Sequence, residues 1–191
     1  MFTIPLSDNV PLRNSTVWGS YKNYRALPVG YGVVNMIPVQ YDAAGTVFFV
    51  LDHPIAGVDL AWINSVPYSG FGWKNDLDAT GKAVSFITLN RPLGEGETLS
   101  IRVRGKLHPL TGELITNPAD ILWDFLSDIC RLPVQSSDLD AFRSECRNRG
   151  ITASGLMADG RRTIRTVIDE LMVSTGAIWS GGMPGYARIY P

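Results

Sequence analysis

The sequence predicts an α+β fold, with an antiparallel β-sandwich or partly open barrel over residues 1–116 and a small unit of three helices and a hairpin over residues 117–191. Two observations predict this division. Up to about residue 116, short runs rich in β-branched and aromatic residues alternate with turn-forming sequences. From Asn117 onward, apolar residues recur with the spacing of an amphipathic helix. The helix predicted to begin at Asn117 could belong to a functional site or to the framework.

Four runs in the first part predict strands. Three of them, TVFFVL at 46–51, VDLAWI at 58–63 and AVSFITL at 83–89, are rich in residues that favour strands. In the fourth, TLSIRVRG at 98–105, Leu99, Ile101 and Val103 alternate with polar residues and so share one face. The turn-forming sequences DAAG, DATG and GEGE separate the runs, and HPLTG follows the last one. Short strands at this spacing are typical of an antiparallel sandwich or barrel.

The first predicted helix begins at Asn117. Asn is a favoured N-cap residue, Pro118 suits the first helical position, and Asp120 is stabilised at the positive end of the helix dipole. The helix is expected to end before Pro133. Its apolar residues form one face: Ile121, Leu122, Phe125, Leu126 and Ile129.

Two further helices and a hairpin complete the second part. A helix is predicted from Ser137, with Asp140 as the partner in a capping box, to Gly150 as a left-handed cap. The next, RRTIRTVIDELMVSTG at 161–176, ends at Gly176. Short strands at 177–180 and 186–190, joined by the turn GGMPG, follow. The helical apolar faces are narrow, so we expect these helices to be packing elements.

Composition and charge restrict the function classes. The chain has 191 residues, 45% hydrophobic and 18% charged, as in an ordinary globular protein. Its formal net charge of -1 argues against electrostatic binding of nucleic acid. No apolar run reaches the length of a membrane span, and the first residues do not have the pattern of a signal peptide. One group of arginines is expected to form either a solvated, salt-bridged helix face or a polar subunit contact: Arg143, Arg147, Arg149, Arg161, Arg162 and Arg165.

The two cysteines, Cys130 and Cys146, fall at apolar helical positions. Buried free thiols in a reducing compartment are the favoured interpretation, although one disulfide is arithmetically possible. Two cysteines without nearby histidines do not complete a zinc site. No metal site is therefore predicted from them.

No catalytic arrangement is evident. His53 and His108 both precede proline and are expected to be surface residues in turns, because no nucleophile with a defined spacing accompanies either of them. DLDATG at 76–81 begins like a calcium loop, but Ile87 stands where that loop needs its bidentate Glu, so a hairpin turn is predicted. The tryptophans, one of which is Trp123, are interpreted as core or interface residues. We predict a protein that is not an enzyme and has no cofactor.

Two stretches resemble the tail-tip or baseplate hub proteins of long-tailed bacteriophages, including the host-specificity proteins of lambda-like phages. The first, ALPVGYGVVNMIPV at 26–39, places Gly30 and Gly32 on either side of Tyr31, where glycines permit a sharp, closely packed chain reversal beside an aromatic anchor. The second covers residues 105–191 and contains GKLHPLTGELITNPADILWDFLSDI, DLDAFRSECRNRGI and TIRTVIDELMVSTGAIWSGGMPGYARIYP. The sequence departs from the family at Ala141, where the family has Ser before the Phe of the second helix.

The resemblance implies a virion protein that closes the end of the tail tube and joins it to tip or fibre proteins during host attachment and DNA delivery. It implies a homotrimer around the tail axis, synthesised in the host cytoplasm. The partners it implies are the distal tail protein, the end of the tape-measure protein and neighbouring tail-tip subunits. In this interpretation the helix at Asn117 and Pro118 is part of the framework, and Trp123 is a contact residue. The alternative is a stand-alone β-sandwich module that binds glycans.

Overall fold

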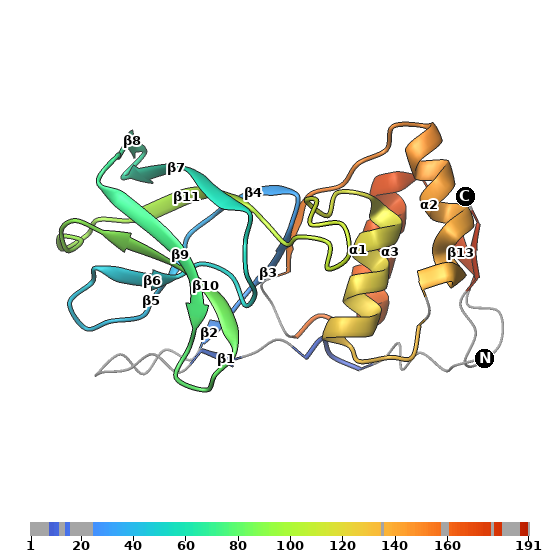
Figure 1. The fold of residues 1–191 in the computed structure, drawn as a ribbon, viewed down its shortest axis with the longest axis horizontal. Helices are drawn as coiled ribbons and strands as arrows, with labels where there is room; N and C mark the ends of the chain where they lie inside the picture. Colours follow the sequence, from blue (N-terminus) through green and yellow to red (C-terminus); the bar gives the residue numbers. More distant parts are fainter. Residues whose placement is uncertain are drawn as a thin grey trace. The chain divides into compact units, whose positions relative to one another are not determined.

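The computed structural model describes residues 8–11, 14–15, 25–134, 136–157, 161–176, 178–180 and 188–190. The fold is α+β, with mainly strands early in the chain and three α-helices later (Figure 1). The chain forms two compact units. The strand unit comprises Leu12–Leu114 and Ser154–Ala158, and the helical unit comprises Met1–Pro11, Ile115–Ala153 and Asp159–Pro191.

The strand unit contains two four-stranded sheets in which every strand pair is antiparallel. The first sheet has the order β5 (Val39–Gln40), β6 (Val47–Phe49), β10 (Ala83–Leu89), β9 (Phe71–Leu77). The second has the order β4 (Val33–Met36), β11 (Leu99–Arg104), β7 (Gly57–Ile63), β8 (Val66–Pro67). Two-stranded pairings join β3 (Val29–Tyr31) to β12 (Gly155–Met157), and β1 (Asn14–Ser15) to β2 (Arg25–Ala26).

One hydrophobic cluster draws on both four-stranded sheets. Ile87 of β10 and Ile101 and Val103 of β11 are fully buried in it. A second cluster lies on the opposite face of the first sheet, where the Tyr41 ring meets the Phe49 ring edge-on with 4.7 Å between centroids. Strand β10 is thus buried on both faces, which is why its sequence is almost continuously apolar.

The predicted strands are confirmed at β6, β7, β10 and β11. The alternation in β11 is also confirmed, because Leu99, Ile101 and Val103 are buried while Arg102 and Arg104 are exposed. Strand β9 was not predicted. Its sequence FGWKNDL carries no alternating pattern because six of its seven residues are exposed.

The helical unit contains α1 (Pro118–Asp124), α2 (Asp140–Asn148) and α3 (Ile164–Thr175), with the hairpin of β13 (Ile178–Ser180) and β14 (Arg188–Tyr190). A π-helical turn, Phe125–Ile129, continues α1, and a 3₁₀ turn, Ser136–Leu139, precedes α2. Helices α1 and α3 pack side by side within this unit (Figure 1). The turn GGMPG lies outside the described residues.

The predicted helix boundaries are confirmed in part. Asn117 caps α1, and Gly150 and Gly176 adopt the left-handed conformation after α2 and α3, with φ of 65° and 69°. The first helix ends before Pro133, as predicted: a π-helical turn continues α1 to Ile129, and the chain leaves the helical conformation at Arg131 (φ 54°). The α-helical part of the second begins at Asp140, later than the predicted Ser137.

Two short segments lie across the boundary expected near residue 116. Strand β12 pairs with β3 inside the strand unit. In the other direction, an isolated bridge joins Asn9 to Thr163 in the helical unit, and the Val10 N–H donates to the Arg162 carbonyl oxygen at 2.9 Å. Each compact unit is therefore built from parts of the chain that are distant in sequence.

Candidate interaction surfaces

The Gly30–Tyr31–Gly32 segment is a closely packed junction inside the strand unit. Tyr31 is 3% exposed, and Gly32 has a left-handed φ of 64°. Gly30 and Gly32 accept hydrogen bonds through their carbonyl oxygens from the backbone N–H groups of Lys106 (2.9 Å) and Gly105 (2.8 Å). A Cβ atom on Gly105 would lie 2.3 Å from the Gly30 carbonyl oxygen. The glycines therefore permit the close approach of two backbones, which is a structural role.

The prediction that His53 is a surface residue is wrong. His53 is 6% exposed, its Nε2 accepts a hydrogen bond from the Gly30 N–H (3.1 Å), and its Nδ1 lies 2.7 Å from the Pro54 carbonyl oxygen. This pairing fits a neutral imidazole with the proton on Nδ1, which ties the loop at His53 to strand β3. His108 does lie in a turn, where its Nδ1 accepts from the Thr111 N–H at 3.3 Å.

The segment that begins like a calcium loop is the hairpin turn between β9 and β10, as predicted. The Asp78 N–H donates to the Lys82 carbonyl oxygen, and the Gly81 N–H donates to the Asp78 carbonyl oxygen, both at 2.9 Å. One Asp78 carboxylate oxygen accepts hydrogen bonds from the N–H and hydroxyl of Thr80. Among the residues that the structure describes, no group of three or more His, Cys, Asp and Glu is placed to hold a metal ion.

Hydrogen bonds hold helix α1 at its N-terminus and near its C-terminus. The Asn117 Oδ1 accepts from the Ala119 N–H at 2.9 Å, and Pro118 is buried at the first helical position. Trp123 is half-buried, and its Nε1–H donates to the Val134 carbonyl oxygen at 3.3 Å. Asn117 and Trp123 therefore make hydrogen bonds within the helical unit, in which Pro118 is buried.

One member of the predicted arginine face is not solvated. Arg143 is 8% exposed and pairs with Asp120, whose carboxylate oxygen lies 2.5 Å from the guanidinium Nε, and also with Asp140. Arg143 is buried because Asp120, the acid expected only to favour the helix dipole, points toward α2. Three other members of the group form ion pairs nearer the surface: Arg149–Glu145, Arg162–Glu170 and Arg165–Asp169.

Both cysteines are free thiols, as predicted. Burial raises the pKa of Cys130 to about 12, and the pKa of Cys146 is also raised, mainly by burial. A thiol whose pKa is raised in this way is a poor nucleophile at neutral pH.

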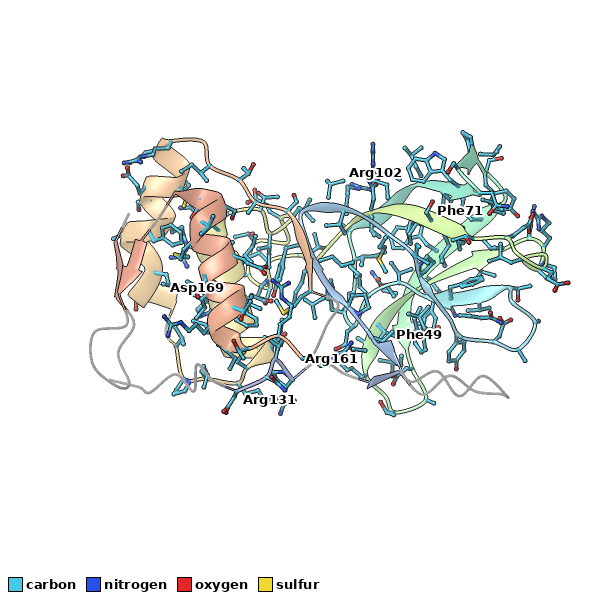
Figure 2. The ribbon with its side chains drawn as sticks, turned by 180° about the vertical axis from the view of Figure 1, so that it is seen from behind. Phe49, Phe71, Arg102, Arg131, Arg161 and Asp169 are labelled. Atoms are coloured by element: carbon cyan, nitrogen blue, oxygen red, sulfur yellow. The ribbon has the colours of Figure 1, made fainter. Side chains whose placement is uncertain are left out.

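The exposed face of the second sheet carries the most distinctive set of side chains. Arg102 lies in β11, one of the two inner strands of this sheet. Its guanidinium carbon lies 5.9 Å from the ring centroid of Trp62, and its Nε–H donates to the Asn35 side chain at 3.2 Å. Figure 2 shows the Arg102 side chain projecting away from the strands. On the same face, Arg104 forms an ion pair with Asp59 at 2.9 Å. We call this surface the outer face of the second sheet.

Two aliphatic side chains flank the arginines on this outer face. Val33 is directly opposite Arg104 in β4, and Leu60 is directly opposite Arg102 in β7, so all four point to the same side of the sheet. Val33 is 45% exposed and Leu60 is 44% exposed. An arginine on a tryptophan with exposed aliphatic neighbours has the composition of a protein interface.

The edge of the first sheet is a second exposed surface. Strand β9 carries Trp73, which is 40% exposed, and Leu77, which is 61% exposed. Between them, the Lys74 Nζ lies 2.5 Å from an Asp76 carboxylate oxygen. The sequence signal for this strand is weak: aromatic and charged residues are mixed in FGWKNDL, directly before the turn-forming sequence DATG.

Comparison with protein-family models, with curated proteins and with solved structures finds no match. None of the described helices is long and apolar enough to cross a membrane.

Proposed function

We propose that this chain is a structural subunit of a bacteriophage tail tip or baseplate hub, in which the two four-stranded sheets form a β-sandwich that contributes to the wall of the hub. The hub would close the end of the tail tube and connect it to tip or fibre proteins during host attachment and DNA delivery. The outer face of the second sheet carries this proposal. It exposes Leu60 and Val33 beside Arg102, side chains suited to a contact with another protein.

The positions that carry the family resemblance support the same interpretation. Gly30 and Gly32 lie in a backbone junction, and Asn117 caps a helix, so each fits a role in the framework. The proposed partners are the distal tail protein, the end of the tape-measure protein and neighbouring tail-tip subunits. The proposed order is a homotrimer, in which two different patches of each copy meet around the tail axis.

The test is complementation of a phage that lacks the gene. Particles made without the chain should have tails without finished tips, and the wild-type chain should restore the tips and infectivity. Arg102→Glu should fold but fail to restore them, because it places an acid at the centre of the outer face. Leu110→Glu is the matched control, because Leu110 is 87% exposed in the same unit and lies outside that face.

Infectious particles with normal tips from the deletion phage would overturn the proposal. Full rescue by Arg102→Glu would remove the outer face as the contact surface.

The second candidate function is that of a glycan-binding module. The observation that favours it is the position of Trp62 beside Arg102 and Asn35, since an aromatic ring flanked by polar groups suits stacking and hydrogen bonding with a sugar. A glycan array separates the two functions. Specific binding by a monomeric chain, lost in Trp62→Ala, would favour the module over the hub.

A further inference from the structure

The strand β9 presents an open edge of the first sheet. It is the last strand in the order β5-β6-β10-β9, and no described strand pairs with its other side. In the neighbouring strand β10, the backbone groups of Ser85 point away from β9. The Ser85 N–H donates to the Leu51 carbonyl oxygen, and the Ser85 carbonyl oxygen accepts from the Val50 N–H. The adjacent residues of β10 must therefore face β9, since backbone groups alternate along a strand.

This alternation decides which backbone groups of β9 point outward. Lys74 and Asp76 lie opposite Phe86 and Val84 of β10, so their backbone groups are directed into the sheet. The backbone groups of Trp73, Asn75 and Leu77 then point away from it. An antiparallel partner strand would form its hydrogen-bonded pairs with these three residues. At Leu77 it would replace the Asp76 carboxylate oxygen, to which the Leu77 N–H donates at 2.8 Å.

We propose that the partner is a second copy of this chain, which pairs β9 with β9 in antiparallel orientation about a two-fold axis at Asn75. This register places Trp73 of each copy opposite Leu77 of the other, and Lys74 opposite Asp76. It would cover two exposed apolar side chains on one face of the sheet and alternate four charges on the other. The first sheets of the two copies would then form one sheet of eight strands.

The charges distinguish this register from its neighbours. A two-fold axis at Lys74 satisfies the same backbone alternation, but it places Lys74 opposite Lys74, and like charges directly opposite each other are destabilising. An axis at Trp73 places Lys74 opposite Gly72, which has no side chain to contact. The axis at Asn75 gives every charged residue an opposite charge and every large apolar residue an apolar partner.

A lysine in the middle of an edge strand is also a common device against such pairing. Here the charge that would repel a generic strand lies two residues from Asp76, so it excludes strands without an acid at the matching position while it accepts its own copy. The inference goes beyond the proposed hub function and does not rest on it. In a threefold ring, the two-fold contact would join two rings back to back.

The test is sedimentation equilibrium of the full chain over a range of concentrations. The wild type should approach twice the 20.9 kDa mass of one chain as concentration rises. Lys74→Glu gives two acids and Asp76→Lys gives two lysines at these positions, so each variant alone should remain at the mass of one chain. A mixture of the two variants should regain the doubled mass, and so should the double variant Lys74→Glu/Asp76→Lys.

The control is Arg149→Glu, which reverses one charge of a surface ion pair at the C-terminal end of α2 and should leave the doubled mass unchanged. Circular dichroism should show the same folded spectrum for every variant. Amide exchange provides a second readout, because pairing should slow exchange at Trp73 and Asn75 in the wild type and in the mixture of variants.

Three results would overturn the proposal: a wild type that stays at the mass of one chain at all concentrations, a doubled mass that persists in Lys74→Glu, or a double variant that does not recover.

Discussion

Replacement of Gly105 by Ala tests whether the junction at Gly30 depends on close backbone contact. An added Cβ would lie 2.3 Å from the Gly30 carbonyl oxygen and 2.7 Å from its carbonyl carbon, and neither atom can rotate away as a side chain can. Overpacking costs about 1–3 kcal/mol in cores, and a clash with backbone belongs at the upper end. We therefore expect Gly105→Ala to lower the free energy of unfolding by about 3 kcal/mol, which corresponds to a fall in Tm of about 6–12 °C for a chain of this size.

The measurement is urea unfolding followed by tryptophan fluorescence and circular dichroism, with Gly155→Ala as the matched control. Gly155 lies in β12, which pairs with β3 at the same junction, but nothing lies within 4 Å of an added Cβ there. The control should unfold like the wild type or at slightly higher urea, because Ala restricts the unfolded chain more than Gly. Equal midpoints for the two variants would refute the role assigned to the close approach at Gly30.

Three further predictions concern single side chains. Trp123→Ala should lower the free energy of unfolding by about 2–3 kcal/mol, because it removes a half-buried indole and its hydrogen bond to the Val134 carbonyl oxygen. Trp123→Phe should lower it by about 1 kcal/mol. Thermal melts of Trp123→Ala that match the wild type would instead place this residue at an interface. Cys130 is partly buried, and this burial raises its pKa to about 12, so it should resist alkylation at pH 8 in the folded protein and react after unfolding, as intact mass would show. Equal rates in the two states would contradict the raised pKa. The hydrogen bond from Arg91 lowers the pKa of Glu97 to about 2. The stabilisation that the ionised Glu97 provides is therefore present above the ordinary carboxyl pKa and is lost as pH falls toward 2. Carbon NMR should show that Arg91→Ala returns the Glu97 pKa toward 4.5, and an unchanged pKa would contradict this cause.

The elements that sequence reasoning predicted are those with a local pattern. Strand β11 has one buried and one exposed face, so the alternate spacing of Leu99, Ile101 and Val103 predicts it. Helix α1 was predicted because Asn117 and Pro118 have residue preferences that act within one turn of the chain. Such features need no knowledge of distant contacts.

The features that were missed depend on distant contacts. Strand β9 is a strand because it pairs with β10, and its exposure on both faces leaves no periodicity to detect. The buried His53 accepts a hydrogen bond from the Gly30 N–H, 23 positions away in the sequence. The buried Arg143 donates to the Asp120 carboxylate, which is also 23 positions away. A local interpretation of either residue gives only a turn or a charged helix face.

The proposal that this chain belongs to a phage tail tip is tested most directly by locating it in purified virions. A chain carrying a small affinity tag, incorporated into particles and labelled with gold, should be seen by electron microscopy only at the distal end of the tail. Particles that contain no labelled chain, or that carry it along the tail tube or on the capsid, would contradict the proposed function.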